Sequence, residues 1–275
     1  MNHLPAPSSI TDVWYHANCA DGFGAAWSAW KVLGDKANYH PVRHGDPMPE
    51  FDSSARLAIV DFAYPRQQLL ELAEKVETII VLDHHRSAAQ DLDGLPFARF
   101  DMSKSGARMA WEYWHPHDEL PELLAYVEDR DLWNWVLPES REVALAITQT
   151  IFSFESWESF QVSQLKAEGR ILLGYQQSLI ARALTKAYWT TLGGHKIPVV
   201  NSLLFQSEIG DELCKKFPEA PFAAVYYQKV DHEAWSLRSI GEFDVSEVAA
   251  QFGGGGHRNA SGFARPLGEV GSQAR

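Results

Sequence analysis

The chain has little cysteine and no long apolar run. Among its 275 residues there are two cysteines, Cys19 and Cys214, which are too few for a disulfide framework. Their spacing matches neither a zinc ribbon nor a CxxC redox motif, so a reducing compartment is expected. The N-terminus lacks a basic region followed by an apolar run, and no stretch of about 18 uninterrupted apolar residues occurs. We therefore expect a cytoplasmic protein without a membrane partner.

Positive charge is also scarce. The sequence has 24 Lys and Arg against 36 Asp and Glu, a formal net charge of −12. This is the wrong sign for a protein that grips long nucleic acid through many phosphates. Long nucleic acid is therefore not an expected partner, and any nucleic-acid substrate should be short.

Apolar and aromatic residues are plentiful, and their pattern in the first half predicts an α/β domain. A content of 45% hydrophobic and 12% aromatic residues can bury a sizeable core, and the length favours two domains. Short β-rich runs alternate with amphipathic segments, which is typical of βαβ units around a mostly parallel sheet. The expected strands are 13–17, 57–62 and 78–85, and the expected helices are 22–33, 65–76 and 105–114.

The second half predicts a helical region followed by a smaller α/β domain. Helical periodicity dominates from about Leu120 to Trp189. After it, strands are expected at 196–202, 222–229 and 235–240, with helices at 207–216 and 245–252. We therefore predict an N-terminal domain with a helical extension over 1–150, a helical connector over 151–194 and a second domain over 195–275.

Polar side chains follow three of the predicted strands in the first domain. Residues 83–85, Asp-His-His, close an apolar run, Asp61 follows LAIV, and the segment HANCADGFG offers His16 and Asp21. Ligands of such sheets gather at the carboxyl ends of strands, and carboxylate with imidazole suits a metal such as manganese. The structural alternatives are a hydrogen-bonded histidine pair and a helix cap at Asp61. Three coincident strand ends favour a metal site.

In the second domain, FGGGGHRNASGF places four consecutive glycines after a helical run. Several N–H groups there could converge on an anion without obstruction by Cβ, and His257 and Arg258 add donors. The guanidinium of Arg238, in SLRS, suits a phosphate. The alternatives are a flexible loop and an exposed strand arginine.

Taken together, these motifs resemble one family. YHANCADG, IVDF, LDHH and AYVEDRDLW resemble the four successive motifs of the DHH phosphoesterases, and FGGGGHRNASGF resembles the glycine-rich signature of the DHHA1 domain. The resemblance extends over roughly residues 13–265. It implies a mostly parallel DHH domain, a helical connector and a smaller α/β DHHA1 domain that binds substrate.

The resemblance also implies a two-metal centre, with Mn²⁺ as the expected ion and Mg²⁺ or another transition metal as the alternative. One ion would be held by His16 and Asp61, and the second by Asp21, Asp61, His84 and Asp129, so that Asp61 bridges the pair. Such ions lie about 3.5 to 4 Å apart and share a hydroxide that attacks phosphorus. In the fourth motif, EDRD, Asp131 is the alternative ligand to Asp129.

Further roles follow from the same resemblance. Asp83 would orient His84, and His85 would contact the scissile phosphate. The family usually has DxDG in its first motif, where this chain has Cys19; this residue is either a thiolate ligand or a small buried side chain. Trp133 and Trp135 either stack on a base or belong to the core. The implied substrate-binding residues are Arg238, Gly254, Gly255, Gly256, His257, Arg258 and Ser261.

The function that the resemblance implies is hydrolysis of dinucleotides or very short oligoribonucleotides by a metal-dependent phosphodiesterase. Three alternatives stay open: a cyclic-dinucleotide phosphodiesterase, a single-strand exonuclease of the RecJ type, and a non-catalytic nucleotide-binding module. A RecJ-type exonuclease carries extra nucleic-acid-binding domains and a basic channel, for which this short acidic chain has no room. A homodimer is compatible with each of these functions.

Overall fold

The computed structural model describes residues 4–43 and 45–267. The chain divides into two compact units, Met1–Leu173 and Gly174–Arg275, and the division falls inside the long helix α8, Val162–Leu184. Both units contain a sheet covered by helices, so the predicted α/β class is confirmed. None of the helices in the described part of the chain is long and apolar enough to cross a membrane.

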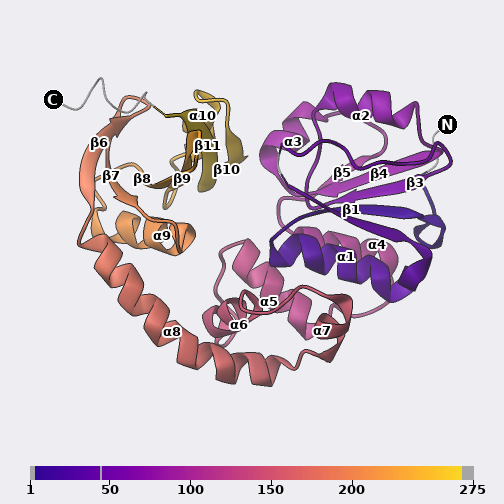
Figure 1. The fold of residues 1–275 in the computed structure, drawn as a ribbon, viewed down its shortest axis with the longest axis horizontal. Coiled ribbons are helices and arrows are strands. Elements are labelled where there is room, and N and C mark those ends of the chain that lie inside the picture. Colours follow the sequence, from indigo (N-terminus) through magenta and orange to yellow (C-terminus); the bar gives the residue numbers. More distant parts are fainter. Residues whose placement is uncertain (1–3, 44, 268–275) are drawn as a thin grey trace. The chain divides into compact units, whose positions relative to one another are not determined.

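The sheet of the first unit has five parallel strands in the order β2-β1-β3-β4-β5 (Figure 1). The edge strand β2 was not predicted; it contains Pro41, which an edge position tolerates. Because the strands are parallel and in register, their carboxyl ends meet at one edge. The strands are β1 Asp12–His16, β2 Asn38–Val42, β3 Arg56–Val60, β4 Thr78–Asp83 and β5 Ala98–Phe100.

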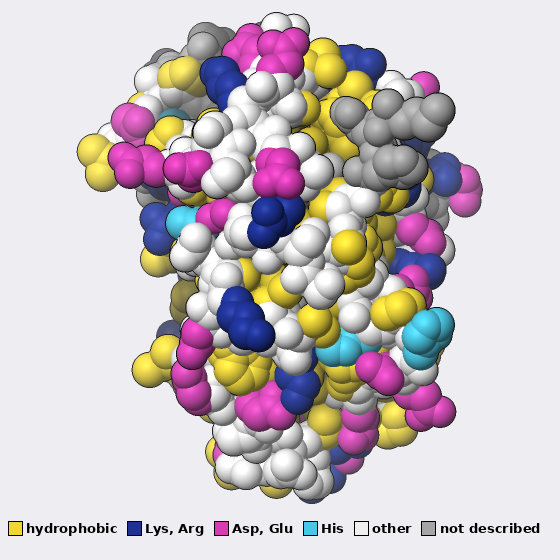
Figure 2. Space-filling view, turned by 90° about the vertical axis from the view of Figure 1, so that its right-hand side faces the viewer, with side chains coloured by type: hydrophobic (Ala, Val, Ile, Leu, Met, Phe, Trp, Pro, Cys, Tyr) yellow, Lys and Arg dark blue, Asp and Glu magenta, His cyan; other side chains and the backbone are white. Residues whose placement is uncertain are grey.

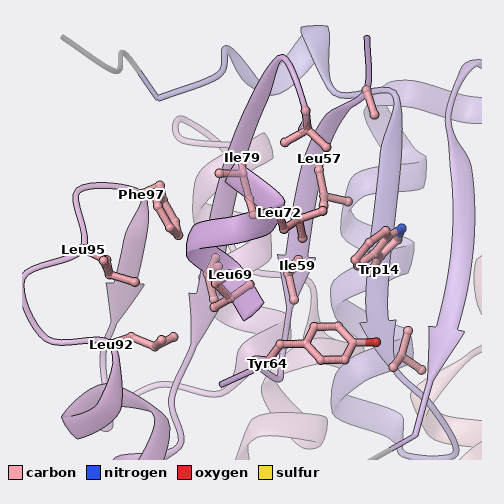
Figure 3. Packing of buried hydrophobic residues seen from close by; sticks show 14 residues of the cluster. Trp14, Leu57, Ile59, Tyr64, Leu69, Leu72, Ile79, Leu92, Leu95 and Phe97 are labelled. Atoms are coloured by element: carbon pink, nitrogen blue, oxygen red, sulfur yellow. The ribbon is translucent and has the colours of Figure 1, made fainter. Parts of the chain in front are cut away.

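Helices cover both faces of this sheet (Figure 1). Side chains alternate along each strand: Val13 and Ala58 face α1 and α4, whereas Trp14 and Leu57 pack under α2 in the core of Figure 3. This alternation produces two buried cores around one sheet. The bounds are α1 Ala20–Leu33, α2 Arg66–Ala73, α3 Arg86–Asp91 and α4 Gly106–Trp114, with 3-10 turns at Pro7–Ser9 and Gly34–Lys36.

A helical extension completes the first unit. Helices α5 Glu122–Asp131, α6 Ser140–Ile147 and α7 Phe154–Ser159 share an aromatic core with α1, centred on Phe23 and Trp157. The first turns of α8 pack closely here, since a Cβ at Gly169 would lie 2.0 Å from the carbonyl oxygen of Glu142. Residues 151–173, part of the predicted connector, therefore belong to this unit.

The second unit has a mixed six-stranded sheet in the order β10-β11-β9-β8-β7-β6, in which β7 and β8 are parallel. Helix α10 covers one face through Trp235, Leu237 and Phe263, and α9 covers part of the other through Val225. The elements are β6 Tyr188–Leu192, β7 His195–Asn201, α9 Gln206–Lys216, β8 Ala223–Gln228, β9 His232–Arg238, α10 Val245–Ala250, β10 Gly255–His257 and β11 Ala260–Pro266.

Candidate metal centre and phosphate-binding face

The turn between β1 and α1 brings three candidate ligands together. Cys19 is the N-cap of α1, and its Sγ accepts a hydrogen bond from the N–H of Gly22 at 3.2 Å. The same sulfur lies 3.3 Å from Nδ1 of His16 and 3.4 Å from Oδ2 of Asp61. Gly22 makes the tight turn feasible, because a Cβ there would lie 2.1 Å from the carbonyl oxygen of His16. The predicted first motif is thus a preformed cluster.

Asp61 occupies the centre of the site. It directly follows β3, adopts a φ of 62°, and is 2% exposed. A left-handed backbone at a non-glycine residue costs roughly 1–3 kcal/mol and is typical of functional sites. One carboxylate oxygen lies 3.2 Å from Nε2 of His84 and the other lies 3.5 Å from Nδ1 of His16. Burial alone would raise the pKa of Asp61, but its contacts with these two imidazoles lower it well below its usual value.

Asp21 is held by the N-terminus of α4. Its two carboxylate oxygens accept hydrogen bonds from the N–H groups of Gly106 at 2.7 Å and Ala107 at 2.9 Å, where the helix dipole favours negative charge. A Cβ at Gly106 would lie only 2.7 Å from Oδ1 of Asp61. The sequence predicted a helix at 105–114, and Ser105 is its N-cap, but the contact of its N-terminus with Asp21 was not predicted.

His84 joins the carboxylates. Its Nε2 lies 3.5 Å from Asp21, 3.2 Å from Asp61 and 3.5 Å from Asp131. Burial lowers the pKa of His84, but these acidic neighbours outweigh it and raise the pKa to about 10. Burial, followed by repulsion from the other carboxylates, raises the pKa of Asp21 well above its usual value. The cluster therefore holds more negative charge than one imidazolium neutralises.

The acidic side chains of the fourth motif have separate roles. The carboxylate of Asp129 accepts hydrogen bonds from the N–H groups of Val136 and Leu137 at 3.0 and 3.3 Å, and so stabilises the turn after α5. Asp131, the alternative in the sequence, is the one whose carboxylate lies beside His84. Glu128 binds Arg108 and the N–H of Ser105. Among the described groups that could hold a metal, Asp131 is included and Asp129 is not.

Asp83 contacts a different histidine ring from the expected one. Its Oδ1 lies 2.7 Å from Nδ1 of His85 and accepts hydrogen bonds from the N–H groups of His84 and His85 at 2.8 and 3.3 Å. Asp83 therefore orients the ring of His85, and its bond to His84 involves only the backbone. Burial lowers the pKa of His85, but the Asp83 carboxylate outweighs this effect and raises it.

In the second unit, Arg238 and His257 share one face of the sheet. Arg238 pairs with Ala260 of β11, which pairs with His257 of β10, and residues directly opposite one another point to the same side. The neighbouring positions on this face, Ser236 and Gly262, are small. The guanidinium of Arg238 donates to Ser207 Oγ at 2.5 Å. Two basic side chains thus flank a half-exposed surface of small residues, which we call the β9–β10 face.

The other predicted phosphate-binding residues have structural contacts. The glycine run is not a flexible loop, the structural alternative considered for it: the N–H of Gly254 donates to Ala249 O at 2.9 Å, and Gly255 and Gly256 belong to the edge strand β10. A Cβ at Gly254 would lie 2.1 Å from Gly262 O, so close strand packing requires glycine. Ser261 is buried on the opposite side of the sheet, where its Oγ donates to His257 O. Arg258 pairs with Glu242.

Three groups of donors could hold metal ions in the first unit. In each group the ligand atoms lie within 4.8 Å of one another. Oxygen and nitrogen donors suit manganese or magnesium, whereas the sulfur suits a softer ion. Burial, with repulsion from neighbouring carboxylates, raises the pKa values of Asp21 and Asp131. A divalent cation bound here would offset both effects, so the cluster fits such an ion. The groups are His16, Cys19 and Asp61; Asp21, His84 and Asp131; and Asp61, Asp83, His84 and His85.

Comparisons with known proteins give two relatives and a similar fold. No family model matches the chain. An uncharacterized protein of Acanthamoeba polyphaga mimivirus is 33% identical over 96% of this chain and 69% of its own length. Oligoribonuclease NrnB of Bacillus subtilis is 24% identical over 75% of this chain and 58% of its own length. The fold is similar to that of RecJ from Thermus thermophilus in complex with Mn²⁺, at a TM-score of 0.53 and 17% identity over 94% of this chain and 50% of RecJ.

Proposed function

The chain belongs to the DHH/DHHA1 family of phosphoesterases, and we propose that it is a metal-dependent phosphodiesterase that hydrolyses dinucleotides or very short oligoribonucleotides. The main support is the position of Asp61. Its two carboxylate oxygens face two different imidazoles, which is the arrangement that a bridging ligand between two ions requires.

The proposed ligands are assigned by proximity. His16 and Asp61 would hold one ion, and Cys19 is positioned to add its sulfur. Asp61 together with Asp21, His84 and Asp131 would hold the second, with Asp131 in the place predicted for Asp129. When bound, such ions supply Lewis acidity and lower the pKa of a bound water, which makes it a nucleophile near neutral pH.

The protein's own groups prepare the phosphate. Asp83 fixes His85 through Nδ1, and the raised pKa of His85 favours the imidazolium, which donates to a phosphoryl oxygen through Nε2. The N-terminus of α4 holds Asp21 by both oxygens, so the ligand is oriented before substrate arrives. Arg238 and His257 on the β9–β10 face bind a second part of the substrate, with Arg238 as the charged donor to a phosphate.

Several observations support a short substrate. The net charge is −12. On the face of the molecule in Figure 2, lysine and arginine side chains are separated by acidic and apolar ones and do not gather into a stripe. A long strand would gain few phosphate contacts from such a surface. The Bacillus relative is named an oligoribonuclease, which agrees with this choice of substrate.

A chelation experiment tests the proposal. Protein stripped with EDTA and reloaded with Mn²⁺, Mg²⁺ or Zn²⁺ is assayed on pApA, on cyclic di-AMP and on a chromogenic phosphodiester, with metal content measured by mass spectrometry. We expect no turnover without metal, the best recovery with Mn²⁺, and the highest kcat/KM on pApA. Full turnover in excess EDTA would exclude the metal mechanism, and a preference for the cyclic dinucleotide would reassign the substrate.

A further inference from the structure

A cavity of about 560 Å³ lies beside the metal centre, entirely within the first unit. The turn between β1 and α1, helices α5 and α6, and the residues Thr150 and Phe152 form its walls. It shares Cys19, Asp21 and Asp131 with the candidate metal centre, so a molecule in the cavity would lie beside the proposed metal ligands. Its size falls in the range of about 300–1,000 Å³ that is typical of small-ligand sites. Most of its far wall comes from the helical extension.

The far wall combines apolar side chains with acceptors. Ile147 and Phe152 line it, and the ring of Phe152 packs against Phe23 with centroids 5.3 Å apart, which fixes its position. Thr148 and Thr150 also line the cavity, and each hydroxyl donates to a helix carbonyl, at 2.7 Å from Leu145 O and Ile147 O respectively. A hydroxyl whose proton is used in this way presents lone pairs. This wall suits a flat, partly apolar group with N–H or O–H donors, such as a nucleoside.

A basic side chain, Arg130, also lines the cavity. It is adjacent in sequence to Asp131. Its guanidinium lies 4.5 Å from the ring centroid of Trp133 and 5.5 Å from that of Trp135. Both tryptophans adopt left-handed backbone conformations, with φ of 58° and 56°. Such backbone strain at bulky residues is typical of functional sites. The indoles orient Arg130, as a phosphate-binding guanidinium requires.

From these features we propose that the cavity is a subsite for one nucleoside monophosphate unit of the substrate. The base and ribose occupy the wall of Phe152, Thr148 and Thr150, and Arg130 binds the phosphate next to the metal centre. This inference rests on the proposed function and adds to it a nucleotide-binding element in the first unit, separate from the β9–β10 face. It agrees with a short substrate, since the cavity holds one nucleotide unit beside the candidate metal ligands.

The test fills the cavity without touching the metal centre. Thr148→Phe places a ring in the cavity, and Ile151→Phe, at a nearby residue that is 81% exposed and does not line the cavity, is the matched control. Calorimetry with Mn²⁺-loaded protein measures binding of AMP, adenosine and inorganic phosphate. We expect Thr148→Phe to weaken AMP binding at least 10-fold and Ile151→Phe to leave it unchanged, with equal metal content in both. Arg130→Met should weaken the binding of AMP and of inorganic phosphate but leave the binding of adenosine unchanged.

The outcomes separate this inference from the proposed function. Equal AMP affinity in wild type and Thr148→Phe would refute the subsite, as would inorganic phosphate binding as tightly as AMP. If Thr148→Phe does not fold, Ala144→Leu, which fills the same cavity by a smaller volume, takes its place. A protein that binds AMP in this way but cleaves no phosphodiester would sustain the subsite and refute the enzymatic proposal. Cleavage of pApA with unchanged kinetics in the cavity variants would refute the subsite and sustain the enzymatic proposal.

Discussion

The two sheets hold their polar side chains in different surroundings. At the carboxyl ends of the parallel strands, Asp21 and Asp61 are each 2% exposed and contact two partners or more. On the β9–β10 face, Arg238 and His257 are half-buried beside small residues. Buried charges must be fully compensated by neighbours, whereas half-exposed ones are compensated in part by water. The first sheet is therefore suited to chemistry and the second to adaptable binding.

This contrast predicts how each region responds to change. A substitution in the buried centre leaves neighbouring charges uncompensated, so it should affect metal binding, stability and turnover together. A substitution on the β9–β10 face should affect only substrates that reach it.

The largest effect is expected at Asp61. Asp61→Asn removes one charge but tolerates the left-handed backbone that would strain alanine at φ 62°. We expect kcat/KM to fall by about 10⁴-fold or more, the scale of losing an essential catalytic group, with loss of bound metal. Activity assays and metal analysis of the purified variant measure this. Two bound ions with normal turnover would show that Asp61 does not bridge them.

Arg238→Ala should have the next largest effect, and only on some substrates. On a dinucleotide we expect kcat/KM to fall by roughly 10²–10³-fold, as for loss of one well-placed charged donor. Metal content should hardly change, and neither should turnover of a chromogenic ester that carries no second nucleotide. Steady-state kinetics on both substrates make the comparison. An equal loss on the two would mean that Arg238 acts through stability and not through binding.

Gly106→Ala tests whether the close packing of α4 against Asp61 is needed for activity. The new Cβ would meet Oδ1 of Asp61 at 2.7 Å, and a displacement of this size is expected to reduce kcat by about 10²-fold. The control is Gly174→Ala, at an exposed position of α8 where a Cβ meets nothing within 4 Å. That control should keep full activity and gain about 0.5–1 kcal/mol of stability. Thermal unfolding and kinetics of both variants are the measurements; full activity in Gly106→Ala would place Asp61 outside the reaction.

Cys19→Asp should have the smallest effect. Aspartate keeps an N-cap acceptor for the N–H of Gly22 and exchanges sulfur for oxygen. We therefore expect Mn²⁺ to bind about 10-fold more tightly and Zn²⁺ to bind more weakly. Calorimetry on wild type, Cys19→Asp and Cys19→Ser measures the affinities. Identical values for all three would show that this side chain does not touch a metal.

The sequence predicted the strand ends because buried apolar runs that stop at Asp or His are conspicuous. It did not resolve Asp129 from Asp131, because both lie in α5 about 200° apart around the helix axis, and composition does not tell which side faces the centre. It also missed Gly106, whose role depends on a contact with Asp61 across 45 residues of chain. Short edge strands such as β5 and β10 carry too few residues for a periodic pattern.

The most direct test of the central claim is a substrate-length series. Wild-type enzyme with Mn²⁺ is assayed on oligoribonucleotides of 2, 3, 4, 7 and 20 nucleotides, lengths chosen to span about one to many phosphate contacts. We expect the highest kcat/KM at 2 to 4 nucleotides and a value at least about 10-fold lower at 20, because the acidic surface adds no binding energy. A kcat/KM that rises steadily with length would contradict it and identify a general exonuclease.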